Sequence, residues 1–308
     1  MLRLPFSRNG RSRPTGAQAD RHRFCAGWYP AGGGHGTLAP ARERKEPLMR
    51  ILALGDIIAP VAVDFLAENL WEYRRREKID FVVANGENAS FLGGIAADAA
   101  KKLLLGGVDV ITGGNHSLQN KGVYALHEEE ERVLRPINYP TDVPGRGYTL
   151  TEAGGVRVLV MNAMGNALIE PVLDSPVPFI RRALAREAGA YDVALLDLHA
   201  EATGEKLAIA HIFDGSFAAI FGTHTHVPTA DTQILPRGTG YVTDLGATAP
   251  TGGILGVRTE VICTRTEQKL SVPYRVAEGP VRAEGVLFEI DGTSNRCTAL
   301  RRVALSGT

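Results

Sequence analysis

The sequence predicts an α/β fold in which buried β-strands alternate with helices. Near-continuous apolar runs at 81–84, 108–112 and 217–221 are typical of strands that are covered on both faces. Segments 62–78 and 96–105 lie between such runs and carry apolar residues at helical spacing. This alternation indicates a layered α/β domain, and 308 residues are enough for one large domain or two small ones.

The expected elements follow one another as strand, polar tip and helix. A strand at 50–54 comes first, before the helix at 62–78, and further strands are expected at 156–162 and 193–196. The last part of the chain shows apolar runs spaced by turn residues, without helical patterning between them. We therefore expect an antiparallel set of strands there, at 259–264, 272–276 and 285–290.

Polar clusters stand at the ends of the apolar runs. They are Gly55-Asp56, Asn85-Gly86-Glu87-Asn88, Gly114-Asn115-His116 and Gly222-Thr223-His224-Thr225-His226, with Asp197-Leu198-His199-Ala200-Glu201 between the last two. Ligands of open α/β sheets collect at the carboxyl ends of the strands, so these side chains are expected to converge. Carboxylates, amides and imidazoles without thiolates suit a pair of iron, manganese or zinc ions. The clusters together point to a metal-dependent phosphate-ester hydrolase.

Each cluster alone also has a purely structural explanation. Asp56 could cap the following helix, Glu87 and its neighbour could form an ordinary turn, and His116 could be a hydrogen-bonded loop residue. His224 and His226 alternate, so an extended segment would project both imidazoles to one face, although such pairs also occur by chance. The metal-site prediction therefore depends on the combination.

Residues 1–48 differ from the rest of the chain in charge and pattern. They hold nine Lys/Arg and three Asp/Glu, whereas residues 49–308 hold 25 basic and 31 acidic residues. Because the segment lacks periodicity and is rich in Arg, Gly and Pro, we expect a disordered extension before one domain at 49–308. Met49 is the expected true start, and a transit peptide or a disordered tail is the alternative.

Composition also limits partners and location. The acidic balance of residues 49–308 argues against a stable complex with nucleic acid. No apolar run reaches the roughly 18 residues of a transmembrane helix. Three scattered cysteines (Cys25, Cys263 and Cys297), with no secretion signal, fit the reducing cytoplasm. The sequence leaves homo-oligomer formation open.

Longer stretches around the clusters resemble the calcineurin-like metallophosphoesterases. Residues 199–206 read His-Ala-Glu-Ala-Thr-Gly-Glu-Lys, and residues 222–231 read Gly-Thr-His-Thr-His-Val-Pro-Thr-Ala-Asp. With Gly86-Glu87-Asn88 where other members carry an aspartate, these motifs are similar to a bacterial branch that acts on cyclic nucleotides. The resemblance covers about residues 49–305 and implies a four-layer α/β sandwich.

The resemblance also implies a role for each polar residue. One metal ion would be bound by Asp56, Glu87, Asn88 and His226, and the second, which shares Glu87, by Asn115, His199 and His224. Iron or manganese is expected, with zinc also compatible. The substrate would be a small phosphodiester, a 2′,3′- or 3′,5′-cyclic nucleotide. A metal-activated hydroxide would attack phosphorus, and His116 would protonate the leaving oxygen.

The chain departs from the family pattern near the expected substrate. Residues 59–63 replace a Gly-x-Pro-Gly-Arg loop, Ser117-Leu118 replace an aromatic residue, and Gly165-Asn166 replace a Gly-Arg pair. The predicted ligands are intact. Two alternatives therefore stay open: a phosphomonoesterase or nucleotidase on the same site, and a metal-binding regulatory protein with weak turnover.

Overall fold

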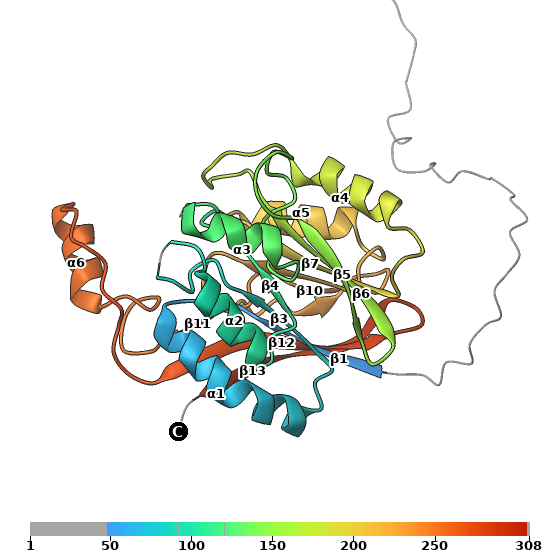
Figure 1. The fold of residues 1–308 in the computed structure, drawn as a ribbon, viewed down its shortest axis with the longest axis horizontal. Coiled ribbons are helices and arrows are strands. Elements are labelled where there is room, and N and C mark those ends of the chain that lie inside the picture. Colours follow the sequence, from blue (N-terminus) through green and yellow to red (C-terminus); the bar gives the residue numbers. More distant parts are fainter. Residues whose placement is uncertain (1–47, 92, 120, 307–308) are drawn as a thin grey trace, which may run out of the picture. The chain divides into compact units, whose positions relative to one another are not determined.

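The computed structural model describes residues 48–91, 93–119 and 121–306. Residues 1–47 lie outside the described part of the chain, and the predictions of a disordered extension and of a true start at Met49 concern this segment. Two β-sheets pack face to face at the centre of the described chain, and helices cover their outer faces (Figure 1). The predicted four-layer α/β sandwich is confirmed.

The first sheet joins strands from both ends of the described chain. Its parallel centre is β1 (Leu48–Leu54), β3 (Phe81–Asn85) and β4 (Val110–Thr112). The other strands are β2 (Asp56–Ile57), β11 (Ala247–Pro250), β12 (Val281–Asp291) and β13 (Arg296–Ser306). The order is β2-β11-β12-β1-β3-β4, and β13 pairs with β12. The C-terminal strands therefore complete the sheet that β1 begins.

The second sheet is mostly parallel, with antiparallel edges. Its order is β5-β6-β7-β8-β10-β9, and only the edge strands β5 and β9 run antiparallel to their neighbours. The strands are β5 (Tyr148–Ala153), β6 (Val156–Met164), β7 (Val193–His199), β8 (Ala219–Thr223), β9 (Gln233–Ile234) and β10 (Gly240–Val242). Strands β7 and β8 end at the same edge, because they pair in parallel register.

Helices cover the outer face of each sheet. The first sheet carries α1 (Pro60–Glu77) and α2 (Ala97–Leu105), and the second carries α4 (Pro176–Arg186) and α5 (Thr203–Ile212). A short 3₁₀ turn, η1 (Lys121–Val123), and α3 (Tyr124–Glu129) follow β4. Within the described ranges, no helix combines the length and the apolar character needed to cross a membrane.

Alternation along β1 shows how one strand serves two cores. Leu52 and Leu54 pack under α1 and α2, whereas Ile51 and Ala53 face the second sheet. Successive side chains of a strand point to opposite faces, so a strand buried on both sides must be apolar throughout. Burial on both faces explains the continuous apolar runs. The apolar side chains between the sheets also set the distance between them, and with it the positions of the strand ends described below.

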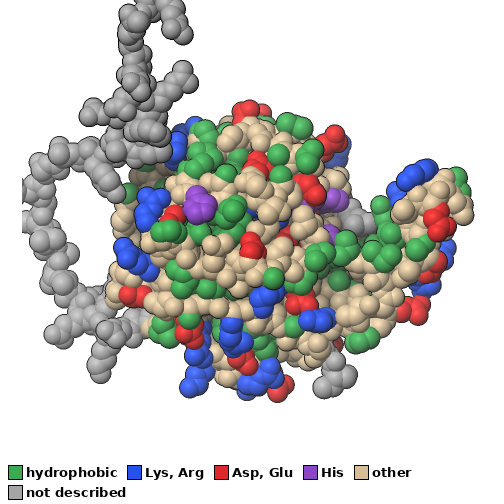
Figure 2. All heavy atoms as spheres, turned by 180° about the vertical axis from the view of Figure 1, so that it is seen from behind, with side chains coloured by type: hydrophobic (Ala, Val, Ile, Leu, Met, Phe, Trp, Pro, Cys, Tyr) green, Lys and Arg blue, Asp and Glu red, His purple; other side chains and the backbone are tan. Residues whose placement is uncertain are grey.

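The predicted strand at 259–264 is wrong. This segment begins α6 (Thr259–Gln268), which stands out from the rest of the described chain in the excursion between β11 and β12 (Figure 1, orange; Figure 2). The expected strand at 272–276 is also absent, and only Val276 forms an isolated bridge, with Val257. The expected strand at 285–290 is confirmed as part of β12, which pairs antiparallel with β1 and β13.

Candidate metal centre

The eight predicted site residues lie at the carboxyl ends of strands from both sheets. The first sheet contributes Asp56 after β1, Glu87 and Asn88 after β3, and Asn115 and His116 after β4. The second contributes His199, the last residue of β7, and His224 and His226 after β8. These residues converge in one contact network, as the sequence predicted. The most distant pair, Asp56 and His226, are 170 positions apart in the sequence and are in contact.

His199 is the centre of one half of this network. Its Nε2 atom lies 3.1 Å from Glu87 Oε1, 3.0 Å from Asn115 Oδ1 and 3.1 Å from His224 Nδ1. Ligand atoms of Glu87, His199 and His224 all lie within 4.8 Å of one another, close enough to share one metal ion. Imidazole nitrogens with carboxylate and amide oxygens suit the metals expected from the sequence.

Asp56 forms the other half with His226. Asp56 Oδ1 lies 3.5 Å from His226 Nε2, and Asp56 Oδ2 accepts a hydrogen bond from the His224 backbone N–H at 3.1 Å. Asn88 Nδ2 donates to Glu87 Oε1 at 3.3 Å, which links this half to the first. Glu87 therefore contacts both Asn88 and His199, one predicted ligand from each half.

Two buried oxygens support a metal at this second half. Asn88 Oδ1 has no hydrogen-bond partner among the described residues, and Asp56 Oδ1 makes no hydrogen bond there although it lies 3.5 Å from His226 Nε2; both side chains are buried. A buried acceptor without a donor is costly, and a cation is one group that removes the cost. Both residues belong to the predicted ligand set of one metal ion, so they fit the expected group.

The buried carboxylates of the cluster favour positive charge beside them. Burial alone would lower the pKa of His199, but the Glu87 carboxylate beside it raises this pKa to about 9. Burial and the nearby His199 imidazolium lower the pKa of His224 to about 4. Burial opposes ionisation of Glu87, yet His199 keeps its pKa below the ordinary value. A protonated His199 thus offsets the negative charge of the neighbouring carboxylates, which is the charge that a bound metal ion would offset.

Gly114 lets the backbone pass directly beside the ligands. A Cβ atom on this residue would lie 2.2 Å from Glu87 Oε2 and 2.3 Å from His199 Nε2. Any side chain would therefore occupy the space between two predicted ligands. The glycine before Asn115 is required by this close approach.

Asp197 and Thr223 orient His199 from behind. Thr223 Oγ1 donates to Asp197 Oδ1 at 2.7 Å and lies 2.9 Å from His199 Nδ1. Because the hydroxyl proton is used on Asp197, Thr223 accepts from His199 Nδ1–H, which directs Nε2 toward the cluster. Asp197 is fully buried, and burial raises its pKa to about 6.

Sequence reasoning gave no role to Asp197, Thr223 or Glu201, although they stood inside the motifs. Glu201 Oε2 lies 3.2 Å from His224 Nε2, on the side away from His199. The available signal was strand alternation, which places Asp197 and His199 on the same face of β7. A carboxylate within an apolar strand requires a polar partner, and that partner is on a different strand.

His116 differs from its neighbours in how it contacts the cluster. Its backbone N–H donates to Glu87 Oε2 at 3.0 Å, while its ring Nδ1 is without a hydrogen-bond partner in the described ranges. The backbone thus helps to hold the central carboxylate.

The chain matches known proteins over nearly all of this domain. The family model described as YmdB-like protein matches residues 52–303. A 2′,3′-cyclic-nucleotide 2′-phosphodiesterase of Bacillus subtilis (strain 168) is 37% identical over 258 residues, which are 84% of this chain and 97% of that protein. The residues matched by the family model include all eight predicted site residues.

Solved structures agree with this match. The crystal structure of a hypothetical protein from Thermus thermophilus has a TM-score of 0.78 and 38% identity, covering 84% of this chain and all of that one. A putative 5′-nucleotidase from Staphylococcus aureus, at 14% identity and a TM-score of 0.51, covers 82% of this chain and 54% of its own and shows the shared fold alone. The resemblance to metallophosphoesterases is confirmed, and the chain belongs to the YmdB-like protein family.

Proposed function

We propose that this chain is a metal-dependent phosphodiesterase that hydrolyses cyclic nucleotides, with two metal ions per chain. One ion would be held by Asp56, Glu87, Asn88 and His226, and the other by Glu87, Asn115, His199 and His224. The observation that carries the proposal is the convergence of these groups, including a buried Asn88 oxygen that has no hydrogen-bond partner among the described residues. The activity of the Bacillus subtilis relative supports the substrate class.

The protein residues divide the remaining work. When bound, the metal ions would supply a hydroxide nucleophile at neutral pH and offset the charge of the phosphodiester. The Glu87 and Asp56 carboxylates bind these ions, and Thr223 keeps His199 Nε2 free to bind one. His116, whose backbone N–H donates to Glu87 Oε2, would hold its imidazole beside the cluster and protonate the leaving ribose oxygen.

A cavity beside Asn115 offers room for the nucleoside. It has a volume of about 380 Å³ and is lined by Asn115, Leu118, Gln119, Tyr139, Glu170 and Pro171. Leu118 and Pro171 supply apolar surface, while the Gln119 amide can pair with a base edge. A base of a cyclic nucleotide would lie here while its phosphate reaches the cluster. Leu118, which replaces an aromatic residue of the family, is therefore a substrate-side residue.

The test is an assay of the purified protein after removal of metal and addition of Mn²⁺ or Fe²⁺. We expect hydrolysis of 2′,3′- or 3′,5′-cyclic nucleotides, with a nucleoside monophosphate as product. Faster release of phosphate from nucleoside monophosphates would instead identify a phosphomonoesterase. Metal binding without turnover of any of these substrates would identify a regulatory metal-binding protein.

A further inference from the structure

The segment that carries His224 and His226 has an unfavourable backbone conformation. Both residues have positive φ angles, 97° for His224 and 64° for His226, with Thr225 between them. Residues other than glycine rarely adopt such angles, and the conformation persists only where the surroundings impose it. Groups that impose it here would set the directions of two predicted ligands.

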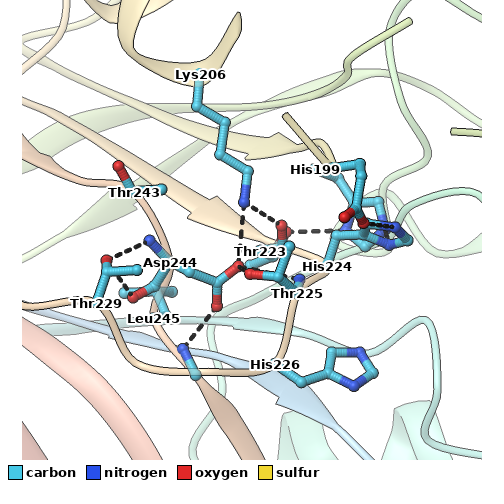
Figure 3. A network of polar contacts seen from close by, with 12 residues as sticks. His199, Lys206, Thr223, His224, Thr225, His226, Thr229, Thr243, Asp244 and Leu245 are labelled. Carbon is cyan, nitrogen blue, oxygen red and sulfur yellow. Dashed lines mark hydrogen bonds and ion pairs between the residues drawn. The ribbon is translucent and has the colours of Figure 1, made fainter. Parts of the chain in front are cut away.

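A buried carboxylate, that of Asp244, holds Thr225. Asp244 Oδ2 accepts from the Thr225 backbone N–H at 3.1 Å and from Thr225 Oγ1–H at 2.8 Å (Figure 3). Asp244 Oδ1 accepts from the Gly246 N–H at 2.8 Å. The preceding N–H, that of His224, donates to Asp56. Successive amides of the segment are thus fixed by two different carboxylates.

Lys206 completes this arrangement from the helix side. In Figure 3 it reaches from α5 to Asp244 Oδ2 at 3.1 Å and to the carbonyl oxygen of Thr223 at 2.8 Å. Lys206 and Asp244 are both fully buried. Buried charges need a partner of opposite charge and further hydrogen bonds, and this pair has both. The pair therefore connects the residue before His224 with the residue after it.

Asp244 is itself held from several sides. Its backbone N–H donates to Thr229 Oγ1 at 2.9 Å, and its carbonyl oxygen accepts from Arg302 Nη1 of β13 at 3.2 Å. Asp231, the last residue of the second sequence motif, accepts from the Thr243 N–H at 3.2 Å. Lys206 and Asp231 thus end the two long motifs without belonging to the predicted ligand set. Both fix the strand end that carries Asp244.

We propose that the Lys206–Asp244 pair is a positioning device that keeps His224 and His226 in their metal-binding conformation. The inference rests on the proposed function, because it presumes that these histidines bind metal. Asp244 is suited to this role because a carboxylate only accepts hydrogen bonds, and here it receives donors from Lys206, Thr225 and Gly246. These residues act through the histidines and do not touch substrate.

Two substitutions at Thr225 test this proposal with little change in volume. Thr225→Val removes the hydroxyl that Asp244 accepts, whereas Thr225→Ser keeps it. We expect Thr225→Val to weaken Mn²⁺ binding by about 10–100-fold, as is typical when a group that orients a ligand is lost. Thr225→Ser should bind like the wild type. Isothermal titration of chelator-treated full-length protein with Mn²⁺ gives the affinity and the number of ions without relying on activity.

Asp244→Asn and a matched control complete the experiment. Asn would place an N–H₂ donor facing the donors of Lys206, Thr225 or Gly246, so at least one of these hydrogen bonds would be lost. Asp244→Asn should therefore also weaken Mn²⁺ binding. The control is Asp109→Asn, because Asp109 pairs with Arg74 at 2.9 Å and lies before β4, at the end opposite to Asn115. It should lower the melting temperature and leave the Mn²⁺ affinity unchanged.

The outcomes separate the inference from the proposed function. If Thr225→Val and every folded Asp244 variant bind Mn²⁺ as tightly as the wild type, the pair serves only the stability of the fold and the inference is wrong. If wild-type protein binds no Mn²⁺ or Fe²⁺, the proposed metal centre itself is wrong. Equal losses in Thr225→Val and Thr225→Ser would also contradict the assigned role of the hydroxyl.

Discussion

Two residues that follow β4 perform different tasks, and each can be tested alone. Gly114 provides space between Glu87 and His199, while His116 contributes a backbone donor to Glu87 and a ring Nδ1 without a partner in the described ranges. We therefore expect a change at the first residue to affect metal binding and a change at the second to affect the substrate. Substitutions at these positions should have different signatures.

Gly114→Ala should abolish binding of at least one metal ion while the protein stays folded. The added Cβ would lie 2.2 Å from Glu87 Oε2, so this carboxylate must move from its position. Gly204→Ala is the matched control, because the Cβ it would add meets no atom of the described residues within 4 Å, apart from its chain neighbours and the backbone of its own helix. Metal analysis and circular dichroism of both variants measure the effect. Full metal content in Gly114→Ala would show that the site is looser than described.

His116→Ala should leave both metal ions bound and slow hydrolysis of cyclic nucleotides by ~10²–10⁴-fold, the usual contribution of a general acid. The loss should be much smaller for a nitrophenyl phosphodiester, because its leaving group needs little protonation. Comparison of the two kcat values in wild type and variant measures this difference. Equal losses on both substrates, or an empty metal site, would be incompatible with a general acid at His116.

The convergence of the candidate ligands could be predicted from the sequence because each lies in a polar cluster that follows an apolar run. The groups behind them could not. Asp197 lies in a polar cluster and Asp244 lies outside all of them, and the partners of both, Thr112, Thr223 and Lys206, are identified only when strands pair and helices pack. Hydrogen bonds between distant elements leave no periodic pattern in the sequence. A motif can therefore include a residue such as Asp197 without indicating which residues it will hydrogen-bond.

At the scale of elements, α6 shows where pattern reasoning fails. Residues 259–264 include two Thr, one Val and one Ile, which favour a strand, yet they form the first part of a helix. Thr264 Oγ1 donates to the Glu260 carbonyl oxygen at 2.8 Å, and Lys269 ends the helix with φ 56°. Val261 is the only residue of α6 that is buried. With so little burial, the segment has no apolar stripe that would reveal a helix.

This exposure predicts rapid amide exchange in α6. A ten-residue helix is marginal in water unless tertiary packing supports it, whereas α1 buries residues along its whole length. Hydrogen–deuterium exchange of the full chain should show protection in α6 that is lower than in α1 by orders of magnitude. Protection comparable to that of α1 would mean that the excursion packs against something, and a second copy of the chain would then have to be tested.

At the scale of the whole molecule, the centre exists because two sheets end at the same place. Asn85 Nδ2 of β3 donates to Asp197 Oδ2 of β7 at 3.0 Å, so the sheets are also linked directly behind the ligands. Apolar side chains between the sheets, such as Ile51 and Phe221, set the distance across which the ligands must meet. The layered packing therefore sets the spacing of the candidate ligands, and we expect a loosened core to reduce the proposed activity before it unfolds the protein.

A titration of activity against metal tests the central claim most directly. Chelator-treated protein should be inactive toward a cyclic nucleotide, and Mn²⁺ or Fe²⁺ should restore activity up to a plateau at two equivalents per chain. Two equivalents are expected because Glu87 lies between two groups of ligands that each need a cation. A plateau at one equivalent would contradict the dinuclear site. Hydrolysis that persists in protein shown to be free of metal would contradict the account as a whole.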